Sequence, residues 1–154
     1  MTVVLVPVSA EQLSQVQEST LQGPVTGFAV TPALCETFGL GPTDGEEADR
    51  TALLLAGLAA LLAHGRRLAL VVEARASDTG DAFGEVTVQD LSWRDVSAVF
   101  ADAPEAADLV AAATRATEGL DLDAAWDTDE VQSLMKEHDL LWFGPEEADV
   151  VLGV

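Results

Sequence analysis

The segment Glu46–His64 limits the choice of fold most strongly, because it predicts a helix with apolar side chains around most of its circumference. Acidic residues gather at its start, where the helix dipole favours negative charge. Gly65 directly follows its end, as glycine commonly does after a helix. The large side chains along it are Leu53, Leu54, Leu55, Leu58, Leu61 and Leu62. A helix that is apolar all round is buried on more than one side. We therefore expect this helix at the centre of the core.

Six other segments have the composition of strands, namely Thr2–Val8, Val25–Val30, Arg66–Glu73, Glu85–Gln89, Val96–Ala101 and Leu140–Phe143. The first is almost wholly apolar, which is typical of a strand buried on both faces. Helices separate some of these strands, while three others follow one another directly. This order predicts an α+β fold, or an α/β fold with an antiparallel portion, in which helices pack on a mixed β-sheet of about six strands.

Short helices are marked by their start signals. The capping pairs are Ser9 with Gln12 and Thr31 with Pro32, and Thr128 is a further N-cap. By the same reasoning, Asp102 is expected to cap a helix that begins at Pro104. The polar segments Ala76–Gly84 and Glu118–Asp127 predict loops.

Length and composition predict one domain spanning residues 1–154. The chain is 49% hydrophobic, which argues against disorder. Its start lacks the basic region of a signal peptide, and its longest apolar stretch, Thr51–Ala63, is shorter than a membrane span. We therefore expect a cytoplasmic protein with no membrane partner. The one cysteine excludes a disulfide within the chain.

Charge narrows the class of partner. The 27 acids and 7 basic residues give a formal net charge of −20. After Arg75, only Arg94, Arg115 and Lys136 oppose the acids. Such a field repels nucleic acid and anionic lipid and attracts basic protein surfaces. We expect a basic protein surface as the partner, and no nucleic acid.

The sequence contains no recognisable catalytic motif. A cysteine nucleophile would need Cys35 together with His64 or His138, and Cys35 fits a small core residue better. We assign no catalytic residue and no cofactor, and the sequence favours a protein that is not an enzyme.

The acidic run after Gly119 offers the best candidates for a metal site, namely Asp121, Asp123, Asp127 and Asp129. Two oxygen positions of a calcium loop are present, but Ala125 occupies the third and Trp126 stands where the loop needs glycine. A solvated acidic loop or a docking face is therefore the stronger interpretation. Among the tryptophans, Trp126 is ringed by acids and is the one more expected to be exposed, where it could anchor a partner together with Glu130, Glu137 and His138. The alternative is that Trp126 covers an edge of the core.

Three segments together resemble a known family: Val3–Val8, Ala29–Leu34 and the closing run HDLLWFGPEE, residues 138–147. The family consists of short acidic cytoplasmic proteins of unknown function from high-GC Gram-positive bacteria. The resemblance implies a bacterial cytoplasmic protein, and it implies no activity, cofactor or catalytic residue.

These observations favour a non-catalytic acidic module for protein interaction or regulation. One alternative is a small enzyme, or a metabolite- or metal-binding protein, with a carboxylate-lined pocket. A second is an anionic mimic of nucleic acid. The apolar tail Val150–Val154 must be covered, which favours a homodimer.

Overall fold

The computed structural model of the chain describes residues 1–153 and shows an α+β fold built on one sheet. The seven strands are β1 (Thr2–Pro7), β2 (Leu21–Phe28), β3 (Leu68–Ala74), β4 (Ala76–Asp78), β5 (Glu85–Leu91), β6 (Val96–Ala101) and β7 (Leu141–Phe143). They lie in the order β4-β5-β2-β1-β3-β6-β7. Every pairing is antiparallel, so the expected fold class is confirmed while the sheet is not mixed.

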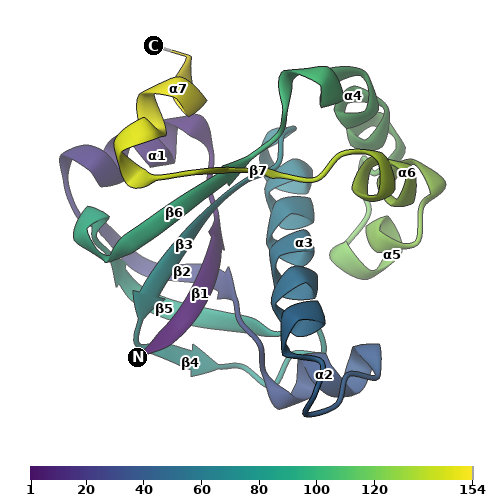
Figure 1. Ribbon diagram of the computed structural model, residues 1–154, viewed down its shortest axis with the longest axis horizontal. Coiled ribbons are helices and arrows are strands. Elements are labelled where there is room, and N and C mark those ends of the chain that lie inside the picture. The colour runs from purple at the N-terminus through teal and green to yellow at the C-terminus, as the bar shows by residue number, and fades with distance from the viewer. Residues whose placement is uncertain (154) are drawn as a thin grey trace.

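Helices cover both faces of this sheet (Figure 1). One face packs against α1 (Ala10–Glu18) and α7 (Ala148–Leu152), with alternate β1 residues Val4 and Val6 fully buried beneath them. The other face packs against α2 (Pro32–Phe38) and α3 (Gly45–His64), with Leu5 and Phe28 in that interface. The alternation of β1 side chains between two apolar layers explains why its sequence is almost wholly apolar.

A second helical layer lies on the outer side of α3. It consists of α4 (Ala107–Ala116), α5 (Leu122–Trp126) and α6 (Asp129–Glu137). Leu58 and Leu61 of α3 pack against Val110, Val131 and Leu134 of this layer. The helix α3 is therefore held between the sheet and three other helices, which confirms the expectation drawn from its apolar circumference.

The start signals of several helices are confirmed by hydrogen bonds. The Ser9 Oγ accepts from the Gln12 N–H at 3.0 Å, and the Gln12 side chain accepts from the Ser9 N–H at 2.9 Å. Thr31 and Thr128 cap α2 and α6 with one bond each, since their Oγ1 atoms accept from the N–H groups of Leu34 and Val131.

Three local expectations are wrong. Asp102 does not cap α4, because its carboxylate is engaged by Arg67. The expected loop Ala76–Gly84 contains the edge strand β4, which pairs with β5. The expected loop Glu118–Asp127 contains α5, whose N-cap is Asp121.

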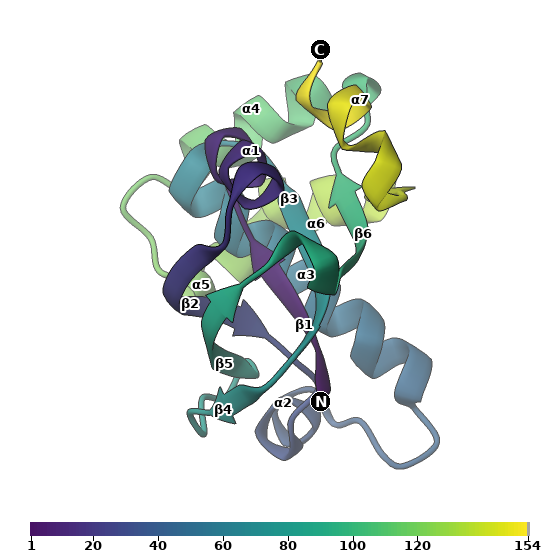
Figure 2. The same ribbon diagram turned by 90° about the vertical axis from the view of Figure 1, so that its left-hand side faces the viewer.

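The C-terminal tail is mostly covered by the protein itself. Val151 and Leu152 of α7 pack on the core beside α1, and Figures 1 and 2 show both helices at the end of the molecule away from the N-terminus. Val150 stays 65% exposed. The last tail residue, Val154, lies outside the described residues.

Candidate functional site

The edge strand β7 carries the most exposed large aromatic side chain in the described part of the chain. Leu141, Trp142 and Phe143 pair with Ala101, Phe100 and Val99 of β6, and no strand lies on their other side. Alternation sends adjacent side chains to opposite faces. Trp142 is 59% exposed on one face, while Phe143 packs against the core on the other. One of these two adjacent aromatic residues therefore packs inside and the other faces outward.

Trp142 stands beside a shallow apolar pocket. Its cross-strand neighbour Phe100 lines this pocket of about 210 Å³ together with Leu53 and Leu54 of α3 and Leu140. The surface formed by Trp142, Phe100, Leu53, Leu54 and Leu140 is called the Trp142 surface below.

Acidic residues border the Trp142 surface. Asp139 lines the pocket and forms an exposed ion pair with Arg50 at 3.4 Å. Asp49 and Glu46 are exposed and precede Leu53 and Arg50 by four residues on α3, so each lies one turn away on the same helix face. The edge of the Trp142 surface therefore carries three carboxylates and one guanidinium, that of Arg50.

A buried arginine holds the segment that leads into β7. The Arg67 side chain is 2% exposed, and its Nε donates to the Asp102 carboxylate at 2.7 Å. The backbone N–H of Arg67 donates to the second Asp102 oxygen at 2.8 Å, and its Nη2 donates to the backbone carbonyl of His138 at 3.0 Å. Its Nη1 has no hydrogen-bond partner among the described residues. Arg67 therefore ties the ends of β3 and β6 to the turn that positions Leu140 and Trp142.

Gly57 allows this arrangement to approach α3 closely. A Cβ atom at Gly57 would lie 3.3 Å from Leu140 Cδ1 and 3.6 Å from Arg67 Cδ. The glycine in the middle of an otherwise leucine-rich helix thus leaves space for the arginine stem and for the entry to β7.

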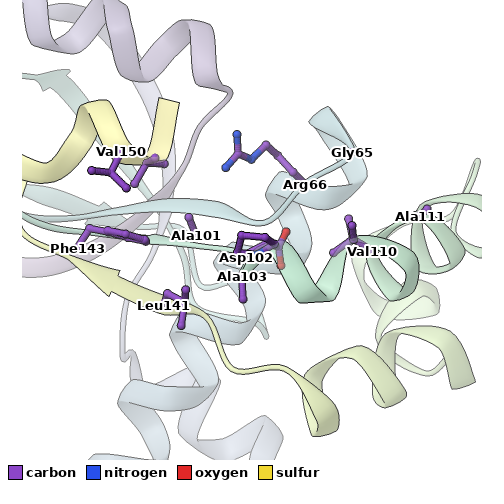
Figure 3. Close-up of a pocket in the computed structure, with 13 residues that line it drawn as sticks. Gly65, Arg66, Ala101, Asp102, Ala103, Val110, Ala111, Leu141, Phe143 and Val150 are labelled. Atoms are coloured by element: carbon purple, nitrogen blue, oxygen red, sulfur yellow. The ribbon is translucent and has the colours of Figure 1, made fainter. Parts of the chain in front are cut away.

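The opposite face of β7 borders a larger pocket of about 650 Å³ (Figure 3). Leu141 and Phe143 form one wall with Val150 and Val151, and the first turns of α4 form the other. Arg66 and Asp102 are the charged residues that line it, and Asp102 is already paired with Arg67. The lining of this pocket is mainly apolar and includes one carboxylate, that of Asp102, so it differs from the carboxylate-lined pocket of the alternative interpretation.

The expected anchor Trp126 is not the exposed tryptophan. Its ring packs edge-on against Phe38 with centroids 5.4 Å apart, and it contacts the cores on both sides of α3. The expectation that Trp126 is the more exposed aromatic is wrong, because α5 turns its side chain towards α3 and α2. The alternative, that Trp126 covers an edge of the core, agrees with this packing.

Two of the other expected interaction residues lie at opposite ends of α6. Glu130 lies in the first turn of α6 and Glu137 is its last residue. They are seven positions apart along the helix, which is a rise of about 10 Å. His138 ends the helix, and its backbone carbonyl binds Arg67.

The four aspartates of the acidic run serve at helix ends. Asp121 caps α5 through the Ala124 N–H at 2.9 Å, Asp123 lies in its first turn and Asp127 follows its last residue. Asp129 begins α6. Over residues 1–153, no group of three or more His, Cys, Asp or Glu side chains is placed to hold a metal ion.

Cys35 is half-buried in α2 and packs against the N-terminal half of α3, whereas His64 is exposed at the C-terminal end of that helix. The core interpretation of Cys35 therefore agrees with its position, and the two residues stand at different ends of α3.

Two important features were missed at the level of sequence. The pair Arg67–Asp102 joins residues 35 positions apart. Its one visible signal in the sequence is that Arg67 directly precedes one apolar strand and Asp102 directly follows another. The helix α5 has a local signal, since Leu122, Ala125 and Trp126 follow the N-cap Asp121 at helical spacing.

Within residues 1–153, no helix combines the length and the hydrophobicity that crossing a membrane requires.

Comparison with known proteins identifies a family for this chain. Neither a curated protein nor a solved structure matches the chain. One family model matches residues 2–152, which is nearly the whole chain. The chain therefore belongs to a family of unknown function, DUF6912.

Proposed function

We propose that this protein is a non-catalytic acidic module for interaction or regulation, and that it docks a basic protein segment on the Trp142 surface. The observation that carries the proposal is Trp142 itself, a large aromatic side chain left 59% exposed on an edge strand. Aromatic residues in such positions commonly anchor protein interfaces, where a few side chains provide most of the binding energy.

The neighbours of Trp142 support a partner side chain that is both apolar and cationic. Phe100, Leu53 and Leu54 line an apolar pocket. Asp139 and Arg50 line it as well and form an exposed ion pair. An arginine can lay its stem along such a surface and its guanidinium over the indole ring. Asp49 and Glu46 add negative charge one turn along α3.

The charge of the whole chain supports the same partner. A net charge of −20 steers basic surfaces to the protein and keeps nucleic acid away. The net charge raises the rate of association with any basic surface. The choice of one partner must therefore come from the Trp142 surface.

The free edge of β7 supports an extended partner segment. An edge strand presents backbone N–H and C=O groups that another strand can pair with. The opposite edge strand, β4, carries only exposed or half-buried small and polar residues, Ala76, Ser77 and Asp78, and so lacks an aromatic anchor.

The cytoplasmic location, the bacterial origin and the homodimer expected from the sequence belong to this proposal as well. The exposed apolar side chains Leu141 and Val150 would be covered in such a dimer.

The proposal is tested by affinity capture from the native cell lysate with three baits in parallel. The baits are the unaltered protein, Trp142→Ala and Val30→Ala, the last removing an exposed apolar side chain away from β7. We expect a basic protein that is captured in stoichiometric amount by the unaltered bait and by Val30→Ala. It should be lost from Trp142→Ala and released from the other baits by high salt.

The purified partner should then bind Trp142→Ala at least about tenfold more weakly than the unaltered protein. Equal capture by the Trp142→Ala bait would contradict the proposed surface. A dominant partner that is not basic and resists salt would contradict the role given to charge.

A further inference from the structure

The pocket on the second face of β7 is separate from the Trp142 surface and has the size and lining of a small-molecule site. Its volume of about 650 Å³ lies within the range that bound metabolites occupy. Its walls come from five parts of the chain: the turn after α3 that holds Gly65 and Arg66, β7, α7, the end of β6 and the start of α4. Leu141 and Val150, 42% and 65% exposed, stand at this pocket with no part of the described chain covering them.

One cation at this pocket has no partner among residues 1–153. Arg66 is half-buried and forms no ion pair or side-chain hydrogen bond with the residues that the structure describes. Asp102 does not neutralise it, because both Asp102 oxygens accept hydrogen bonds from Arg67. Figure 3 shows the Arg66 side chain between the wall that holds Val150 and the wall that holds Val110.

The start of α4 offers the pocket few free backbone donors. Ala103, Pro104 and Ala107 line the pocket, but Pro104 has no N–H, and the N–H groups of Ala106 and Ala107 already donate to the carbonyls of Ala103 and Pro104. The attraction for an anion at this pocket therefore comes from Arg66. Glu105 and Asp108 lie in the same turns, but both are exposed and neither lines the pocket.

We propose that this pocket binds an amphipathic carboxylate, with its aliphatic or aromatic body against Phe143, Val110 and Val151 and its carboxylate on the Arg66 guanidinium. The inference goes beyond the proposed protein docking, since it uses the other face of β7 and the opposite charge. Arg66 attracts an anion at this pocket because no described residue pairs with it. This local attraction acts against the field of the whole protein, whose net charge is −20.

The opposition between local and overall charge gives a sharp test. Decanoate and decylammonium have the same apolar chain and opposite head groups. The overall charge favours decylammonium at any site on the protein, whereas Arg66 favours decanoate at this one. We expect calorimetric titration at neutral pH to show one decanoate site, at least about tenfold tighter than any decylammonium site.

Two variants locate the site. Arg66→Ala should remove the preference for decanoate while Arg66→Lys keeps most of it, and Arg115→Ala, an exposed arginine outside the pocket, should change nothing. Ala111→Trp fills the pocket from an exposed helix position and should abolish binding of the apolar chain.

The proposal is overturned if decylammonium binds as tightly as decanoate, or if decanoate shows no saturable binding. It is also overturned if binding survives in a folded Ala111→Trp protein. Circular dichroism of each variant establishes that it is folded. None of these outcomes bears on Trp142, so the docking proposal is judged separately.

Discussion

The Asp102→Ala substitution tests the physical account of how the β7 segment is held. In the native protein the Arg67 side chain is 2% exposed and Asp102 supplies two of its hydrogen bonds, one to Nε and one to the backbone N–H. Without Asp102, a buried guanidinium keeps only the bond from Nη2 to the His138 carbonyl. Nothing else within the described chain compensates its charge.

Removing one partner of a buried ion pair costs about 3–5 kcal/mol, because the other charge stays buried without compensation. For a chain of this size each kcal/mol lowers the melting temperature by about 2–4 °C. We therefore expect Asp102→Ala to melt about 6–20 °C below the unaltered protein, measured by circular dichroism and by urea unfolding. Asp108→Ala, which removes an exposed acid from α4, is the control and should change the unfolding free energy by less than about 0.5 kcal/mol.

The double variant Arg67→Met/Asp102→Ala separates charge from packing. Replacing both ionic partners by apolar side chains removes the uncompensated charge, so it should recover most of the stability lost in the single variant. A single variant that loses less than about 1 kcal/mol would refute the reasoning, as would a double variant no more stable than the single one.

Truncation of the two tryptophans should change the free energy of unfolding by different amounts. Trp126→Ala opens a gap against Phe38 and should lower it by about 2 kcal/mol or more. Trp142→Ala removes an exposed side chain and should change it by less than about 0.5 kcal/mol. Thermal unfolding of both variants measures the difference, and equal costs would contradict the two placements. Gly80 and Gly84 both have positive φ, but a Cβ at Gly84 would lie 2.5 Å from the Ala29 carbonyl oxygen while Gly80 faces open space. Gly84→Ala should therefore cost at least about 2 kcal/mol more than Gly80→Ala by urea unfolding, and a smaller gap would show that the turn adapts.

Local signals predicted much of the secondary structure because they depend on neighbours in sequence. The capping pair Ser9–Gln12 and the Thr31–Pro32 helix start act within one helical turn, so their formation depends on neighbouring residues and not on distant parts of the chain. The apolar circumference of α3 similarly demanded cover on two sides, which the sheet and the outer helices supply.

The candidate site depended on contacts that no local pattern contains. The partner of Arg67 could be named only once β3 and β6 were known to be neighbours with their ends aligned. Exposure of the tryptophans was decided in the same way. Trp126 has acids around it in sequence but α3 and α2 around it in space, whereas Trp142 gains its exposure from being the outward residue of an edge strand.

Hydrogen–deuterium exchange of the full chain, alone and with the captured basic partner, tests the central claim most directly. The account predicts that the partner slows amide exchange chiefly in residues 140–143 and in the first turns of α3, with little change in α5 and α6. Protection centred on Trp126 and the start of α6, with β7 unaffected, would contradict it and return the docking site to the acidic run.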